Sequence, residues 1–326
     1  MSFASILYLL IGSGACAATF LSLPFWREWS RRTGLTDEPG TRKQHRGAVP
    51  LAGGFAILTG LIVPLLAFAV LLPLGLLPPE WSEKIRYGFS HRSGQLMAIL
   101  AGAAGMSLLG WFDDRHELRA APKFAGQVAI ATLVAAAGIR ITIFVPSVAF
   151  SYVLTIMWIV TVTNAFNFMD NMNGLCAGLA VIATLLLGLG SAFHGHYLVA
   201  GIAFLSSGAV LGFLPYNYPR ATAFLGDSGS HLIGYLLAVL TILPHFYTAK
   251  YPNHWAVLSP LLILGLPLAD LAWVVGLRWR LGQPFYIGDA NHLSHRLVRR
   301  GLNPTQAVLL IWLLGAAVGA LALLWV

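Results

Sequence analysis

Apolar runs long enough to cross a lipid bilayer recur along the whole chain, and they limit the fold more than any other feature. A membrane-spanning helix needs about 20 mostly apolar residues. Only 10% of the 326 residues are charged, against about 25% in a soluble domain. We therefore predict an all-α, polytopic integral membrane protein with about ten transmembrane helices in a single domain, 1–326. The ten runs are 3–25, 51–77, 95–112, 124–139, 149–166, 174–191, 196–214, 230–248, 256–278 and 304–326.

Lys and Arg residues are concentrated in alternate loops between these runs. One set of loops holds 15 of the 20 Lys and Arg residues, counting Arg278 at its edge, and the opposite set holds 5. Because positively charged loops stay in the cytoplasm, the first set is predicted to be cytoplasmic and both termini to lie outside. The net charge of +8 then reflects topology and attraction to anionic lipid or phosphate, and we expect no nucleic-acid partner. The predicted cytoplasmic loops are 26–50, 113–123, 167–173, 215–229 and 279–303.

Two adjacent aspartates, Asp113 and Asp114, end the third run. Neighbouring carboxylates repel each other unless a positive group lies between them. Solvation of a helix end explains one aspartate. For two that are followed by Arg115, Arg119 and Lys123, a magnesium ion or a bound phosphate with its cations is the better explanation.

The next predicted cytoplasmic junction, NAFNFMDNMNGL at 164–175, is rich in amide side chains. Its polar residues recur at a spacing that places them on one face of a helix. Such a stripe is costly in a membrane unless it faces a partner helix or a wet cavity. Hydrogen bonding between helices is the simpler alternative. The number of such residues within a short stretch favours a ligand site that reads a nucleobase edge or holds a ribose. The stripe consists of Asn164, Asn167, Asp170, Asn171 and Gly174.

The fourth predicted cytoplasmic loop contains FLGDSGS. Gly226 permits a tight turn close to a ligand, and Ser228 and Ser230 are predicted to cap the helix that follows. Capping does not require an acid between glycines. Asp227 is therefore a candidate ligand for Mg²⁺, which takes one or two carboxylates and completes its shell with water and substrate phosphates.

The fifth loop contains GDANHLSHRLVRR. Phosphate recognition by His292, His295 and Arg296 is the favoured interpretation. Zinc is disfavoured because no cysteine or third histidine lies nearby, and a juxtamembrane patch of snorkelling cations is the simpler alternative.

Two further features lie on or near the same predicted face. The first loop carries a basic cluster that includes Lys43, His45 and Arg46. Asp270 lies inside the ninth run near Pro260 and Pro267, and we expect it to face a kinked, hydrated groove.

Five blocks together resemble the polyprenyl-phosphate N-acetylhexosamine-1-phosphate transferases of glycosyltransferase family 4, most closely those similar to undecaprenyl-phosphate N-acetylglucosamine-1-phosphate transferase. Each motif is weak alone, but five in the family's order are specific. The blocks are DEPGTRKQHRGAVPLAGG, DDRHELRAAPKFAGQ, NAFNFMDNMNGL, FLGDSGS and the DANHLSHRL loop, between residues 37 and 297.

The resemblance implies that a polyprenyl phosphate attacks the β-phosphorus of a UDP-sugar with Mg²⁺ or Mn²⁺ bound, which releases UMP and starts a lipid-linked envelope glycan. Phosphoryl transfer depends mainly on positioning and charge neutralisation, which agrees with the residues above. The implied setting is the bacterial inner membrane with a cytoplasmic active site, and a homodimer is compatible with such a fold.

The resemblance also implies a role for each residue. Asp227 would bind the metal, while Asp113 and Asp114 would orient or deprotonate the lipid phosphate. The nucleoside pocket would contain Asn167, Asp170 and Asn173; the diphosphate would meet His292, His295 and Arg296; and Lys43, His45 and Arg46 would lie near the nucleotide.

The chain departs from the family pattern at two places. Asp170-Asn171-Met172-Asn173-Gly174 stands where much of the family has Asp-Gly-x-Asp-Gly, and Ser294 interrupts the usual consecutive histidines. A phospho-N-acetylmuramoyl-pentapeptide transferase-like activity and a non-catalytic relative that binds lipid or nucleotide remain alternatives. A transporter would show internal repeats and polar groups near the membrane midplane, and the sequence has neither.

Overall fold

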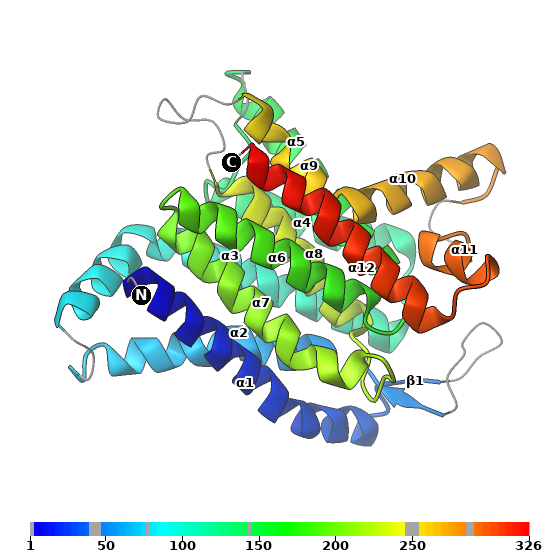
Figure 1. The fold of residues 1–326 in the computed structure, drawn as a ribbon, viewed down its shortest axis with the longest axis horizontal. Coiled ribbons are helices and arrows are strands. Elements are labelled where there is room, and N and C mark those ends of the chain that lie inside the picture. The colour runs from blue at the N-terminus through cyan, green and yellow to red at the C-terminus, as the bar shows by residue number, and fades with distance from the viewer. Residues whose placement is uncertain are drawn as a thin grey trace.

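Twelve α-helices and one short pair of strands make up the described part of the chain (Figure 1). The computed structural model describes residues 3–38, 47–75, 79–142, 145–244, 254–284 and 290–325. Strands β1 (Thr36–Asp37) and β2 (Val49–Pro50) pair antiparallel. The helices are α1 (Phe3–Arg32), α2 (Gly53–Leu71), α3 (Pro79–His116), α4 (Ala120–Ala136), α5 (Val148–Met169), α6 (Leu175–Phe193), α7 (Tyr197–Asn217), α8 (Gly226–Ile242), α9 (Ser259–Ile263), α10 (Gly265–Arg280), α11 (Leu293–Arg299) and α12 (Pro304–Leu321), with 3-10 turns at His254–Leu258 and Ala322–Leu324.

The lengths and apolar character of these helices confirm an all-α, multi-pass membrane protein. Seven helices within the described ranges are long and apolar enough to cross a membrane, and an eighth span results if the bent pair around α9 and α10 counts once. Helices α4 and α8 coincide with two further predicted spans but have 17 residues each, so the number ten stays a prediction. The pair α6 and α7, which only a short turn separates, forms two distinct helices.

One predicted boundary was wrong. Residues 79–94, predicted as a loop, belong to α3, because Pro79 is favoured at the first helical position and no later proline breaks the helix. The kink expected in the ninth span is confirmed, since His254–Ile263 and Gly265–Arg280 meet at 68°. Pro267 accounts for the break: it lacks an N–H, and its ring would clash with the carbonyl four residues earlier.

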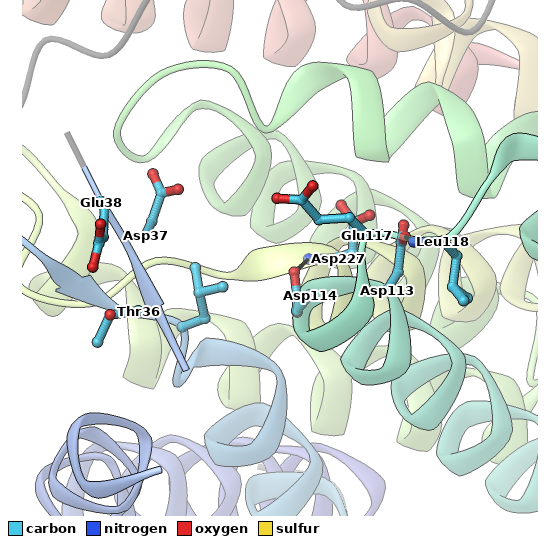
Figure 2. A pocket seen from close by; sticks show the side chains of 9 residues that line it. Thr36, Asp37, Glu38, Asp113, Asp114, Glu117, Leu118 and Asp227 are labelled. Atoms are coloured by element: carbon cyan, nitrogen blue, oxygen red, sulfur yellow. Dashed lines mark hydrogen bonds between the residues drawn. The ribbon is translucent and has the colours of Figure 1, made fainter. Parts of the chain in front are cut away.

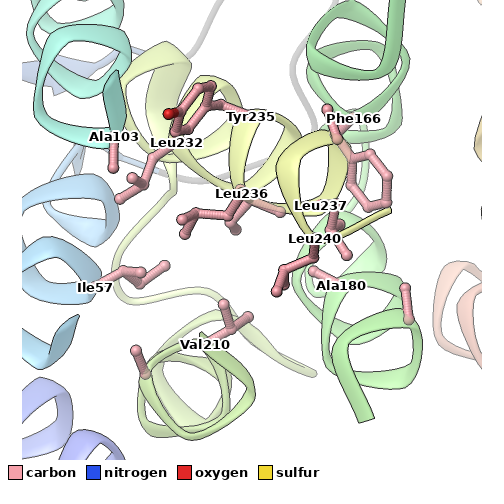
Figure 3. Close-up of a cluster of buried hydrophobic side chains, with 14 of the residues drawn as sticks. Ile57, Ala103, Phe166, Ala180, Val210, Leu232, Tyr235, Leu236, Leu237 and Leu240 are labelled. Atoms are coloured by element: carbon pink, nitrogen blue, oxygen red, sulfur yellow. The ribbon is translucent and has the colours of Figure 1, made fainter. Parts of the chain in front are cut away.

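Helix α8 lies at the centre of the bundle. Every residue from Ser228 to Thr241 is buried, so this helix is enclosed on all sides rather than amphipathic. Figure 3 shows leucines of α8 and Tyr235 surrounded by side chains from α2, α3, α5, α6 and α7. The body of α8 is therefore held in a fixed position relative to five neighbouring helices.

Glycines allow neighbouring helices to approach α8 closely. A Cβ atom on Gly110 of α3 would lie 2.2 Å from the carbonyl oxygen of Asp227. A Cβ on Gly234 of α8 would lie 2.6 Å from the Cα atom of Thr163 in α5. Both contacts are with backbone atoms, which cannot move aside by a change of rotamer.

The Gly110→Ala variant is expected to be less stable and to displace the first turn of α8. Forcing a methyl group into a packed backbone contact costs about 1–3 kcal/mol. The measurement is the melting temperature in detergent. Gly105→Ala is the matched control on the same helix, because its Cβ would meet only the Ile130 side chain at 3.4 Å. Equal melting temperatures for the two variants would contradict the prediction.

The polar segments gather at one end of the bundle. In Figure 1, β1, α11 and the connection from α7 to α8 lie toward the same end, while both chain ends lie away from β1. The carboxyl ends of α3 and α5 and the amino ends of α4 and α8 meet there, as their side-chain contacts show.

Candidate active site

Two carboxylates from different helices share one lysine. Asp113 lies in the last turn of α3, Asp227 in the first turn of α8, and Lys123 in the first turn of α4. The Lys123 Nζ atom lies 2.6 Å from Asp113 Oδ2 and 2.5 Å from Asp227 Oδ2. The Lys123 side chain is only 18% exposed, so this ion pair is partly shielded from water and stronger than one on an open surface.

Asp114 holds the amino terminus of α8. Its Oδ1 accepts a hydrogen bond from the backbone N–H of Asp227 at 2.8 Å, and its Oδ2 accepts one from Ser228 at 3.0 Å. A carboxylate at this position satisfies N–H groups that have no partner within the helix and opposes the positive end of the helix dipole. Asp114 thereby fixes the backbone that carries Asp227.

The prediction that Ser228 and Ser230 cap α8 was wrong. The helix begins at Gly226, which has φ +66°, so both serines lie inside the helix and not at its cap position. Ser228 Oγ lies 2.9 Å from Ser107 Oγ of α3, and Ser230 Oγ accepts a hydrogen bond from Asn167 at 2.9 Å.

Asn167 links α5 to the acid cluster, the name used here for Asp113, Asp114 and Asp227. Its Nδ2 donates to Asp227 Oδ1 at 2.6 Å, so Asp227 is held by an amide on one oxygen and an ammonium on the other. Asn164, one turn earlier, donates to Gln127 Oε1 at 2.7 Å.

The expected continuous helical stripe is only partly observed. Helix α5 ends at Met169, so Asn164 and Asn167 lie on it, whereas Asp170 and Asn171 lie in the following turn. Gly174 has φ +77°, a backbone conformation that glycine adopts readily. The helical spacing therefore stops applying after Met169.

Asp170 is a partly buried acid in an acidic surrounding. Burial raises its pKa to about 8, and the charges of Asp227, Asp114 and Asp37 add to the shift. Asp170 is therefore largely protonated at neutral pH and able to donate a hydrogen bond.

The Asp170→Asn variant is expected to lose part of the pH dependence of stability. Because the pKa is raised on folding, the contribution of this carboxyl is fully present below its unfolded pKa of about 4 and is lost as the pH rises through about 8. The melting temperature of the unsubstituted protein in EDTA should fall between pH 5 and pH 8 by several degrees more than that of the variant. Parallel curves would rule out this pKa shift.

A cavity of about 610 Å³ opens beside the acid cluster. Figure 2 shows Asp37 and Glu38 on one side of it and Asp113, Asp114 and Asp227 on the other. The accumulation of carboxylates favours an occupant that brings cations with it. The lining residues are Thr36, Asp37, Glu38, Leu51, Asp113, Asp114, Glu117, Leu118 and Asp227.

The predicted histidine cluster lies at the start of α11. His292 Nδ1 lies 2.7 Å from Asp270 Oδ2, and both side chains are buried. The His292 and Phe168 rings also pack in a T-shaped arrangement, at a centroid distance of 5.7 Å. His295 lies beside His292, at 6.4 Å between ring centroids. Arg296 stacks over Trp273 of α10.

The departures from the family pattern have direct structural partners. Ser294 Oγ donates to Asn171 Oδ1 at 2.6 Å, so two of the unusual residues contact each other and attach α11 to the turn after α5. Asn173 is exposed, and its Nδ2 donates to the Pro219 carbonyl oxygen at 3.2 Å. Asn173 is not among the residues that line the 610 Å³ cavity.

Three predicted residues, Lys43, His45 and Arg46, lie outside the described residues. The sequence interpretation missed Lys123 as the bridge between two acids, and it missed Asp37, Glu38 and Glu117 as cavity residues. The position of Lys123 in the DDRHELRAAPKFAGQ block was a usable signal, but only the fold brings the DE pair of the first loop to the same cavity.

Comparison with known proteins identifies the family of the chain. Residues 96–245 match glycosyl transferase family 4. The decaprenyl-phosphate N-acetylglucosaminephosphotransferase of Mycobacterium tuberculosis H37Rv is 33% identical over 332 residues, which cover 93% of this chain and 79% of that protein. The chain belongs to glycosyl transferase family 4. It is therefore a phosphoglycosyltransferase, and the resemblance drawn from the five sequence blocks is confirmed.

Two other relatives of this family are similar over most of their length. The probable undecaprenyl-phosphate N-acetylglucosaminyl 1-phosphate transferase of Bacillus subtilis strain 168 is 30% identical over 302 residues, 90% of this chain and 77% of that protein. The undecaprenyl-phosphate alpha-N-acetylglucosaminyl 1-phosphate transferase of Escherichia coli K12 is 28% identical over 327 residues, 94% of this chain and 80% of that protein. The family match spans the acid cluster and Asn167, and the longer alignments extend the similarity over nearly the whole chain.

Proposed function

We propose that this protein transfers N-acetylglucosamine 1-phosphate from a UDP-sugar to a polyprenyl phosphate and releases UMP. A phosphate oxygen of the lipid forms a new bond to the β-phosphorus of the donor, and the bond from that phosphorus to the bridging oxygen of UMP breaks. The observation that carries the proposal is the pair of carboxylates, Asp113 and Asp227, which line a cavity at the end of a membrane bundle and share the ammonium group of Lys123.

The carboxylate pair fits a hard divalent cation. Among the described residues no three His, Cys, Asp or Glu side chains are grouped to hold a metal. Mg²⁺ does not need such a group, because it takes one or two carboxylates together with water and substrate phosphates. Asp227 and Asp113 would hold Mg²⁺ or Mn²⁺. When bound, the ion would neutralise the negative charge of the transferring phosphoryl group.

The chain's own residues have separate roles in positioning the substrates and the metal ligand. Asp113 would orient the lipid phosphate, and Lys123 would offset the charge of the phosphate groups. Asp114 keeps Asp227 in place through the α8 backbone. Asn167 fixes the second oxygen of Asp227.

The donor would enter from the polar end of the bundle. Asp170, Asn167 and Asn173 would meet the nucleoside, while His292, His295 and Arg296 would meet the diphosphate. Lys43, His45 and Arg46 of the first loop would lie near the nucleotide. We place this end of the bundle on the cytoplasmic side of the inner membrane and both termini on the opposite side. The reason is that the predicted cytoplasmic loops carry most of the Lys and Arg residues.

The test is UMP release by the detergent-purified full chain with undecaprenyl phosphate, Mg²⁺ and a panel of UDP-sugars. We expect release with UDP-N-acetylglucosamine that stops when the lipid is omitted or when EDTA is added. The Asp227→Asn protein, purified in the same way, controls for a contaminating host enzyme. No lipid-dependent release with any donor, from protein that still binds UDP-sugar, would reject the proposal in favour of a non-catalytic relative.

A further inference from the structure

Asp270 is a buried acid for which the proposed reaction has no role. It lies in α10, after the 68° bend that divides the ninth predicted span. A carboxylate inside a membrane-spanning helix is costly unless specific partners compensate its charge. The reason for its presence should therefore be found in those partners.

Both oxygens of this carboxylate bind the start of α11. Oδ2 lies 2.7 Å from His292 Nδ1, and Oδ1 accepts the backbone N–H of Leu293 at 2.6 Å. Figure 1 shows α11 beside the end of α10. One side chain thus fixes both the imidazole and the backbone that carries it.

This contact selects one form of the His292 ring. A carboxylate accepts hydrogen bonds, so His292 must carry a proton on Nδ1 to be bound by Asp270. Nε2 is then the only ring nitrogen left for a ligand. The contact with Phe168 restricts rotation of the ring, and a hydrogen bond to one imidazole nitrogen commonly sets the role of the other.

The same helix end is tied to the acid cluster through α5. Phe168, which packs against His292, directly follows Asn167, which binds Asp227. Ser294 binds Asn171 three residues further on. The position of the His292 ring is therefore coupled to the position of Asp227 by neighbouring residues of one segment.

We propose that Asp270 is a positioning residue that holds His292 with its Nδ1 protonated and its Nε2 directed to the diphosphate of the donor. This inference rests on the proposed function, in which His292 meets that diphosphate. Asp270 itself touches no substrate. Its effect passes entirely through His292.

The first measurement is the tautomer of His292 by nitrogen-15 NMR of histidine-labelled full chain in detergent. The signal is assigned by its loss in His292→Gln. We expect protonated Nδ1 in the unsubstituted protein. In Asp270→Asn the amide can accept the Leu293 N–H and then presents its NH₂ group to Nδ1, so the proton should move to Nε2. An unchanged tautomer in Asp270→Asn overturns the inference, and this result does not depend on whether the protein is active.

The second measurement is the kinetics of UMP release. Asp270→Asn is expected to lower kcat by about 10²-fold or more, while KM for the UDP-sugar changes little, because an interaction made in the transition state is lost. Combined with His292→Gln, it should cause no further loss, since residues acting as one unit are not additive. A further loss in the double variant, or a normal kcat despite the changed tautomer, overturns the inference.

The Asp270→Glu variant tests the same inference if the Asp270→Asn variant does not fold. It keeps an acceptor for the Nδ1 proton but moves the ring by about one methylene group. The tautomer should stay unchanged while kcat falls about tenfold, and loss of the Nδ1 proton in this variant would count against the inference. Absence of UMP release from the unsubstituted protein would instead reject the proposed function.

Discussion

The Asp227→Asn variant is expected to release UMP at least about 10³-fold more slowly than the unsubstituted protein, because it removes a charge aimed at the reacting phosphates. Asp227 accepts hydrogen bonds on both oxygens, from Lys123 at one and Asn167 at the other. An asparagine has only one acceptor, so its NH₂ group would face another donor whichever way it points. The variant therefore loses both the negative charge of Asp227 and its ability to accept hydrogen bonds on two oxygens.

Folding of this variant should be largely preserved. Asp114 still binds the backbone of α8, and the apolar core around that helix is unchanged. Glu28→Gln is the matched control, since it converts an exposed carboxylate paired with Arg32 on α1, and exposed pairs contribute little to stability. Asp227→Asn with more than a tenth of normal turnover would remove Asp227 from the catalytic machinery.

The Lys123→Met variant is expected to change two properties in opposite directions. Turnover should fall by about 10²- to 10³-fold, because the ammonium group that would help to offset the phosphate charge is lost. The affinity of the substrate-free protein for Mn²⁺ should rise, since Asp113 and Asp227 lose the ammonium group that now lies 2.6 Å and 2.5 Å from them. Electron paramagnetic resonance of free Mn²⁺ measures the second effect without any activity.

The Lys123→Arg variant tests the positive charge of the side chain separately from its shape. It retains the positive charge, so Mn²⁺ affinity should stay close to that of the unsubstituted protein. Its planar guanidinium cannot take the place of a compact ammonium, so turnover should be intermediate. Weaker Mn²⁺ binding in Lys123→Met would show that Lys123 supports the metal site instead of competing with it.

Sequence periodicity was informative where a residue lay in a regular element and failed where the element ended. Asn164 and Asn167 lie on α5 as predicted, but the stripe stops at Met169 because the chain turns there. Ser228 and Ser230 looked like capping residues because the start of α8 was placed too late. The actual cap is Asp114, which is more than 100 positions away in the chain. No local pattern identifies a cap from another helix.

The sequence by itself determined the membrane class, the family and the identity of the acids and amides that collect at one end of the bundle. Those properties depend on apolar run length, loop charge and ordered motifs, all of which are local. Only the tertiary structure decided the partners: Lys123 between Asp113 and Asp227, Asp114 on the α8 backbone, Asp270 on His292, and Ser294 on Asn171. The physical reason is that hydrogen bonds and ion pairs act over about 3 Å, and the close packing of helices at glycines such as Gly110 brings residues far apart in sequence to that distance.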